Sequence, residues 1–124
     1  MALPIPILRQ GSYLIASLQS ALSDDDWIEL RAELSRRVAE ARSLGVVIDV
    51  SSVDVLDSFA TRMLRSIAEI ARLRGADAVI AGIAPDVAFA MVQLGLTLEG
   101  VSTVLDLDSA IELLAHRTRA RARG

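Results

Sequence analysis

Residues 54–61 place two carboxyl groups beside a hydroxyl group, in a pattern that could support phosphate chemistry. Asp57 can cap a helix that begins at Ser58, and the Ser58 hydroxyl then lies in the exposed first turn, among unpaired backbone N–H groups. Those N–H groups and the positive end of the helix dipole would bind a phosphate on Ser58. The phosphate would add about −1.5 to −2 charges beside Asp54 and Asp57. Ordinary helix capping accounts for the same spacing, so these residues alone do not assign a function.

The helix predicted from Ser58 to about Arg74 has one apolar and one charged face. The apolar residues share one side, which should be buried: Ala60, Met63, Leu64, Ile67 and Ala71. The opposite side carries Ser58, Arg62, Arg65, Glu69 and Arg72. A solvated face, with Glu69 paired to a neighbouring arginine, and a docking surface both fit this pattern. The candidate partner-binding surface consists of the residues around the serine: Asp54, Asp57, Phe59, Thr61, Arg62 and Arg65.

Phe59, the residue after the candidate serine, allows two interpretations. An exposed aromatic side chain at this position would be an anchor for a partner protein. Partial burial against the ends of the neighbouring strands fits equally well. The sequence leaves both interpretations open.

The sequence lacks the combinations of residues that catalytic sites usually need. The chain has no cysteine and no lysine, which removes thiolate metal sites, cysteine nucleophiles and a P-loop. The one histidine, His116, has no second histidine to help bind a metal, and we expect it on a solvated helix surface. Asp49 ends a predicted buried strand, a position favoured for function in α/β sheets, but no nucleotide-binding glycine motif or nucleophile elbow accompanies it. We therefore expect a non-catalytic protein with no metal and no cofactor.

The composition indicates one soluble domain. The chain of 124 residues is 52% hydrophobic but only 3% aromatic, and such an aliphatic core suits a parallel sheet covered by helices. The net charge is −3, and the segment 117–124 contains four arginines and no acidic residue. The remaining chain is therefore more acidic still, which argues against nucleic acid as the main partner. With no signal-peptide pattern and no run of about 18 apolar residues, we expect a cytoplasmic protein without membrane contact.

Turn residues and short apolar runs predict the order of the elements. Ser23 is predicted to cap the first helix, which should run to about Leu44 and stop at Gly45. Pro85 should open the third helix, and Ser109, with a glutamate at capping-box spacing, the fourth. The apolar stripe of the first helix is predicted to be Ile28, Leu34, Val38 and Ala41. The predicted strands are 5–10, 12–18, 46–50, 78–82 and a short strand within 101–107.

The order β-β-α-β-α-β-α-β-α predicts an α/β fold with a mostly parallel sheet, about four helices and right-handed βα connections. Residues 1–116 are expected to form a single domain. The arginine-rich residues 117–124 are expected to form a flexible tail. In the second strand, alternation places Tyr13, Ile15 and Ser17 on one face and Leu14, Ala16 and Leu18 on the other.

Several separated motifs resemble those of STAS domains, the domains of anti-sigma-factor antagonists. The run GVVIDVSSVD from Gly45 to Asp54, followed by Asp57-Ser58-Phe59, is similar to the core motif of the family. Within the family the sequence most resembles the RsbS-type subunits of bacterial stressosomes. Further similarity to that subgroup lies in Ile5-Pro6-Ile7-Leu8, Gly82-Ile83-Ala84-Pro85 and Leu105-Asp106-Leu107, while Gln93-Leu94-Gly95 replaces the Glu-Leu-Gly of the subgroup. The resemblance covers roughly residues 4–115.

This resemblance implies a SpoIIAA-like fold and a role in regulating the general stress response or a related output. Ser58 matches the serine that is phosphorylated in the family, and the kinase would be an RsbT-type switch kinase. The unphosphorylated protein would form homodimers, join RsbR-type STAS co-antagonists in a large assembly and sequester the kinase. Phosphorylation would release the kinase. In RsbR-type relatives the modified residues are threonines, which makes Thr61 a candidate for a second site.

Two other classes of function remain open at this stage. A stand-alone anti-sigma-factor antagonist would use the same serine to bind an anti-sigma kinase and free a sigma factor. Phe59 occupies a position where many antagonists of that type have serine or glycine, which favours the stressosome. The other class is a small-ligand sensor, which no cluster of polar pocket residues supports.

Overall fold

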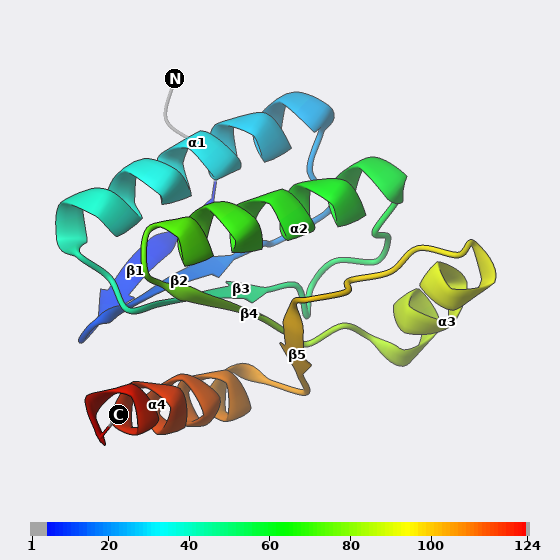
Figure 1. The fold of residues 1–124 in the computed structure, drawn as a ribbon. Coiled ribbons are helices and arrows are strands. Elements are labelled where there is room, and N and C mark those ends of the chain that lie inside the picture. Colours follow the sequence, from blue (N-terminus) through cyan, green and yellow to red (C-terminus); the bar gives the residue numbers. More distant parts are fainter. Residues whose placement is uncertain (1–4, 124) are drawn as a thin grey trace.

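The computed structural model describes residues 5–123 as nine elements in the predicted order (Figure 1). The strands are β1 (Ile7–Gln10), β2 (Tyr13–Ser17), β3 (Gly45–Asp49), β4 (Asp77–Ala81) and β5 (Ser102–Val104). The helices are α1 (Asp24–Ala41), α2 (Ser58–Leu73), α3 (Pro85–Gln93) and α4 (Leu107–Arg123). The predicted α/β class with four helices is therefore confirmed.

The five strands form one sheet in the order β1-β2-β3-β4-β5. Only β1 and β2 are antiparallel; β2, β3, β4 and β5 run parallel. Ile15 is paired with Val47, which is in turn paired with Val79, so one apolar row crosses the middle of the sheet. Because the carboxyl ends of parallel strands meet at one edge, the loops that lead into α2 and α3 start from that same edge.

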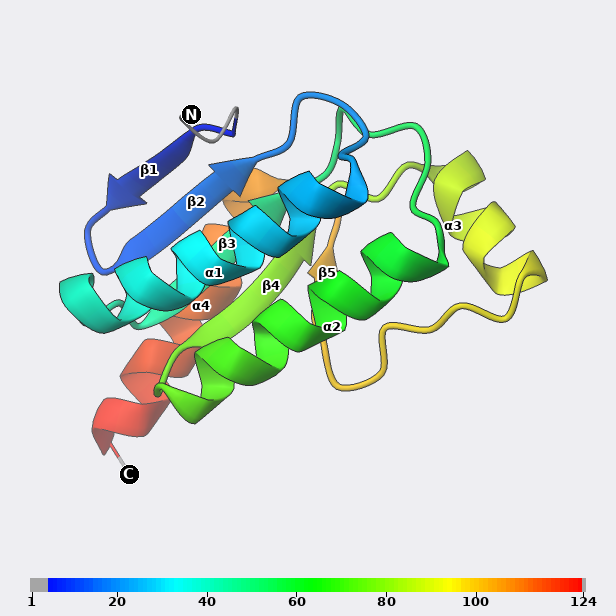
Figure 2. The same cartoon turned by 90° about the horizontal axis from the view of Figure 1, so that it is seen from above.

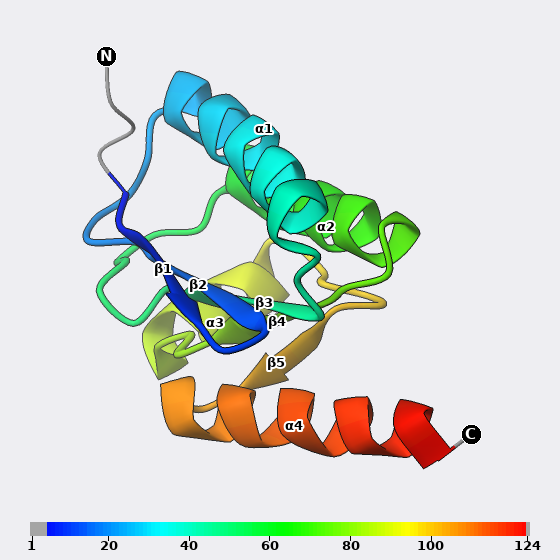
Figure 3. The same cartoon turned by 90° about the vertical axis from the view of Figure 1, so that its left-hand side faces the viewer.

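Helices cover both faces of the sheet (Figure 3). The larger core lies under α1 and α2 and includes Leu14, Ala16 and Leu18. The smaller core lies under α4, where Ile15 is buried and Tyr13 packs against it. The predicted alternation of β2 is therefore confirmed. Helix α3 lies beyond the end of the sheet rather than over either face (Figure 1).

The start of α1 follows the prediction, but its buried face is rotated. The Ser23 hydroxyl accepts a hydrogen bond from the backbone N–H of Asp26 at 3.1 Å, as expected of a cap. The buried stripe consists of Trp27, Leu30, Leu34 and Val38. Ile28 is exposed and Ala41 only partly buried, so these two residues were wrongly placed in the stripe. One position along a helix changes the direction of a side chain by about 100°, and contact with α2 and the sheet fixes which side is buried.

Helix α1 ends earlier than predicted, and Gly45 is not its stop. Arg42 adopts the left-handed conformation, with φ of 49°, and its N–H donates to the carbonyl of Val38. Gly45 instead opens β3, where a Cβ atom would lie 2.8 Å from the side chain of Leu114. The glycine therefore serves the close approach of α4 to the sheet.

Helix α4 begins before the predicted cap. The carboxylate of Asp106, rather than Ser109, caps it by accepting a hydrogen bond from the Ser109 N–H at 2.8 Å. This hydrogen bond holds the pKa of the Asp106 carboxyl below its usual range. The predicted capping box at Ser109 was wrong because the helix starts at Leu107, so its cap lies three residues earlier, at Asp106.

The arginine-rich end is helical and not a flexible tail. Residues 117–123 continue α4, whereas residue 124 lies outside the described part. Arg121 forms an ion pair with Asp77 at 2.8 Å, and Arg117 donates to the Ser102 hydroxyl at 2.7 Å. Both partners lie on strands, so the arginines fix the end of α4 against the sheet.

Across residues 5–123, each helix is too short or too polar to span a membrane. Within the same residues, no group of three or more histidine, cysteine, aspartate or glutamate side chains could hold a metal ion. His116 lies on the exposed surface of α4, as predicted.

Candidate functional site

The loop between β3 and α2 positions the candidate serine. At its start, the Asp49 carboxylate accepts hydrogen bonds from the backbone N–H of Ser51 at 3.0 Å and from the Ser51 hydroxyl at 2.7 Å. Farther along, Val53 and Leu56 are buried in the larger core. The loop is therefore anchored at several points before α2 begins, and Asp49 has a structural role in its first turn.

Asp57 caps α2, as the sequence predicts. Its backbone is extended, and its carboxylate accepts a hydrogen bond from the Ala60 N–H at 2.8 Å. Ser58 is the first residue of the helix and is exposed to solvent. The cap leaves other N–H groups of the first turn without helical partners. The hydroxyl of Ser58 therefore lies where a kinase can reach it and where an added phosphate meets backbone donors.

Replacing Asp57 by alanine is expected to lower the free energy of unfolding by about 1 kcal/mol, because the carboxylate cap of α2 is lost. Asp57→Asn keeps an oxygen acceptor at the same position and should change the stability by only a few tenths of a kcal/mol. Urea unfolding followed by circular dichroism measures both variants. Equal losses would show that the charge of Asp57, and not the cap, stabilises the helix.

Thr61 is buried and offers almost no surface to a partner. Its side chain is only 1% exposed, and its hydroxyl donates to the carbonyl oxygen of Asp57 at 2.9 Å. Thr61 was counted among the residues of the partner-binding surface, but this position faces the core side of α2, although it is only three residues from Ser58. A kinase would reach its hydroxyl only after the first turn of α2 had opened.

The two faces of α2 are as predicted. The buried set includes Ala60, Met63, Leu64, Ile67 and Ala71. The exposed set includes Ser58, Arg62, Arg65, Glu69 and Arg72, and Asp54 and Asp57 of the preceding loop are also exposed.

Phe59 is half-buried against the larger core, so partial burial is the interpretation that applies to the isolated chain. The guanidinium of Arg62 lies 5.8 Å from the centre of the Phe59 ring, within the range of a cation–π contact. Of the predicted surface residues, Phe59 and Arg62 thus contact each other next to the candidate serine.

A groove runs beside the exposed face of α2. Its first part, of about 300 Å³, is lined by Ser58, Thr61, Arg62, Arg65, Gly95, Leu96 and Thr97. Its second part, of about 490 Å³, is lined by Arg62, Arg65, Ser66, Ala68, Glu69, Arg72, Glu99, Gly100 and Val101. Because Arg62 and Arg65 line both parts, we treat them as one feature, the α2 groove.

The far wall of the α2 groove is the segment 94–101, which connects α3 to β5. Figure 2 shows this segment running alongside α2. Arg72 holds the two walls together, since its guanidinium donates to the carbonyl oxygen of Gly100 at 2.7 Å. Sequence reasoning missed this wall, because no local motif pairs residues 94–101 with a helix some thirty residues earlier in the chain.

Comparison with known proteins gives the family. Residues 5–110 match the STAS domain. Two curated relatives from Bacillus subtilis (strain 168) are RsbT co-antagonist proteins: RsbRC is 40% identical over 73 residues and RsbRA 35% identical over 81 residues. These stretches cover 59% and 65% of the chain but only 26% and 30% of the relatives, so the chain spans less than a third of their length.

Solved structures of STAS proteins match a larger part of the chain. A serine-to-glutamate variant of RsbS from Moorella thermoacetica superposes with a TM-score of 0.80 at 33% identity, covering 94% of this chain and 98% of that one. A chain of a stressosome structure gives a TM-score of 0.74 at 32% identity, covering 92% and 99%. Unphosphorylated SpoIIAA, at 11% identity with a TM-score of 0.66 over 90% and 97%, shares the fold. This chain therefore belongs to the STAS-domain family and has the SpoIIAA-like fold.

Proposed function

We propose that this chain is a non-catalytic scaffold of a bacterial stressosome that is switched by phosphorylation of Ser58. In the unphosphorylated state it sequesters an RsbT-type serine kinase. When that kinase phosphorylates Ser58, the kinase is released and activates the general stress response or a related output in the cytoplasm.

The observation that carries this proposal is the position of Ser58. The residue is exposed at the first position of a helix whose cap, Asp57, is formed by a different side chain. A phosphate can therefore be added without removing a hydrogen bond that stabilises the fold. The new charge of about −1.5 to −2 changes the surface formed by Asp54, Asp57, Phe59, Arg62 and Arg65, which we propose as the surface that contacts the kinase.

The proposed partners follow from the similarity to RsbS, to a stressosome chain and to RsbT co-antagonists. The chain forms homodimers and assembles with RsbR-type STAS proteins into a large particle, without nucleic acid or a cofactor. A stand-alone anti-sigma-factor antagonist is the alternative. Size-exclusion chromatography with light scattering separates the two: a large particle with an RsbR-type protein supports the scaffold, whereas a one-to-one complex with an anti-sigma kinase alone supports the alternative.

Incubation with the RsbT-type kinase and ATP is expected to place one phosphate on Ser58, because this hydroxyl is exposed at the proposed contact surface. Mass spectrometry of the peptides locates the phosphate. In the control variant Ser58→Ala, incorporation should fall to background while kinase binding is retained. Phosphate found on another residue, or undiminished incorporation into Ser58→Ala, would overturn the assignment.

A further inference from the structure

The α2 groove carries unpaired positive charge beside the candidate serine. Arg62 and Arg65 line both parts of it, and Arg72 lines the second part. Within residues 5–123, the ion pairs involve other arginines, namely Arg36, Arg37 and Arg121, and neither Arg62 nor Arg65 is paired with a carboxylate. This contrasts with the acidic net charge of the chain.

We infer that the α2 groove binds a carboxylate-rich, extended segment of the kinase and that a phosphate on Ser58 displaces this segment by pairing with Arg62 and Arg65. This inference rests on the proposed function, which it deepens by naming the chemistry of the partner and the mechanism of release. Release then follows from competition for two arginines and not from repulsion alone.

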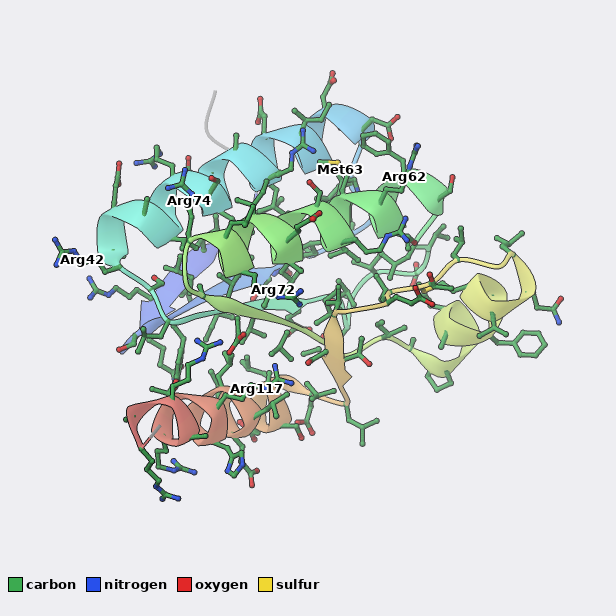
Figure 4. The ribbon with its side chains drawn as sticks, in the orientation of Figure 1. Arg42, Arg62, Met63, Arg72, Arg74 and Arg117 are labelled. Atoms are coloured by element: carbon green, nitrogen blue, oxygen red, sulfur yellow. The ribbon has the colours of Figure 1, made fainter. Side chains whose placement is uncertain are left out.

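The shape of the groove favours a segment of a protein over a small molecule. Its two parts together extend along α2 from Ser58 to Arg72, and both are open to solvent. Figure 4 shows Arg62 near the start of α2 and Arg72 near its end. Apolar side chains, Leu96 in the first part and Val101 in the second, contribute to the far wall. Glu69 and Glu99 also line the second part, whereas the first part, beside Ser58, contains Arg62 and Arg65 and no carboxylate. An extended chain that places its carboxylates in the first part and apolar residues along the far wall suits this lining.

The helix spacing places the phosphate within reach of both arginines. Ser58 and Arg62 are four residues apart, so their Cβ atoms lie about 5–6 Å apart on adjacent turns. Arg65 follows seven residues after Ser58, on the same exposed face, and lines the same part of the groove. In the unphosphorylated chain, Arg62 lies over the Phe59 ring. A phosphate is a stronger partner than a ring, because arginine binds phosphate with charge-assisted, often bidentate hydrogen bonds.

Competition is effective because the phosphate is attached to the same helix. It meets the arginines intramolecularly, at an effective concentration in the millimolar range or above. A carboxylate of the kinase, by contrast, stays near the arginines only as long as the rest of the interface holds the kinase in place. Once the phosphate occupies Arg62 and Arg65, the kinase segment loses its charge partners and its dissociation accelerates.

The first experiment measures the dissociation constant of the RsbT-type kinase, without ATP, for two charge-reversal variants. Arg65→Glu should weaken binding about tenfold or more, because it places a negative charge inside the groove. Arg74→Glu is the matched control: Arg74 is exposed just after α2, outside the groove, and lines a separate hollow with Arg42. It should change the constant by less than about twofold. Equal effects of the two variants would overturn the inference.

The second experiment needs no kinase and tests the displacement step directly. Phosphoserine is installed at position 58 during translation, and ³¹P NMR follows its titration. With Arg62 and Arg65 present, the second pKa of the phosphate should lie below its ordinary value of about 6. In the double variant Arg62→Ala and Arg65→Ala it should return toward that value, whereas Arg74→Ala should leave it unchanged. An identical pKa in all three proteins would overturn the inference.

Failure of the proposed function and failure of the groove inference give different results. If the kinase neither binds the chain nor phosphorylates Ser58, the proposed function fails, whatever the NMR titration shows. If the kinase binds and phosphorylates Ser58, but Arg65→Glu binds it as the wild-type protein does, the proposed function stands and the groove is not its docking site.

Discussion

Thr61→Glu is expected to destabilise the domain strongly, whereas Ser58→Glu leaves its stability almost unchanged. Thr61 is 1% exposed, so a carboxylate there loses nearly all of its hydration. Such a substitution costs several kcal/mol, about 4 or more, against a total stability of about 5–15 kcal/mol for a domain. Ser58 is exposed at the helix start, where a negative charge interacts favourably with the dipole, so its variant should stay within about 0.5 kcal/mol of the wild-type protein.

Circular dichroism and urea unfolding of the two variants measure this difference. Thr61→Val is the matched control, because it keeps the buried volume and removes only the hydroxyl that donates to Asp57. It should cost about 1 kcal/mol. A folded Thr61→Glu protein with wild-type stability would show that position 61 is accessible, and Thr61 would then again be a candidate for modification.

This contrast shows why one hydroxyl at the site is suited to a switch and its neighbour is not. Both side chains lie in the first turn of α2 and both contribute to the lining of the groove. Only Ser58 can carry a charged group without a change in the packing of the domain. Modification of Thr61 would require the first turn of the helix to open, which couples any such event to partial unfolding.

Helix α2 could be predicted almost completely because its signals are local. The capping residue Asp57, the apolar repeat that includes Leu64 and the charged face that includes Arg65 all fall within one short stretch. The strands β3 and β4 could be predicted equally well, since each is a short apolar run between turn residues. Where neighbouring residues determine the structure, sequence patterns are sufficient.

Long-range packing explains where the predictions from the sequence were wrong. Gly45 has the residue type of a helix stop, yet the glycine is needed where Leu114 approaches β3, a contact between distant parts of the chain. Arg42 takes the left-handed position in its place. The arginines after residue 116 have the composition of a flexible tail, but Arg121 pairs with Asp77. Nothing near Arg42 or Arg121 in the sequence indicates these contacts.

The same limit applies to the candidate site. Ser58, Asp57 and the arginines of α2 could be identified because they follow one another along a predicted helix. The far wall of the α2 groove could not, since residues 94–101 reach α2 only through the path of the chain around α3 (Figure 2). The groove exists only because these two segments are brought together, and its charge can be judged only when both walls are known.

Gly82→Ala is expected to destabilise the domain by about 2–5 kcal/mol and to slow phosphorylation of Ser58. Gly82 follows β4 with φ of 83°, a conformation that costs a residue with a Cβ atom about 1–2 kcal/mol. The added Cβ atom would also lie 2.8 Å from the Cβ and 3.1 Å from the Cα of Ser51, and this overlap costs about 1–3 kcal/mol more. Ser51 opens the loop that leads to Ser58, so relief of the overlap must move the loop.

Gly75→Ala separates the conformational cost of a Cβ atom from the cost of its overlap with Ser51. Gly75 has a similar φ of 86°, but no atom lies within 4 Å of its added Cβ. This variant should lose only the conformational share, about 1–2 kcal/mol, and should be phosphorylated at the wild-type rate. Urea unfolding and the initial rate of phosphate incorporation by the kinase are measured for both variants. Equal stability losses and equal rates would show that Ser51 accommodates the added Cβ atom without a shift of the loop. A slower rate in Gly82→Ala alone would show that contact between the end of β4 and this loop sets the geometry in which the kinase meets Ser58.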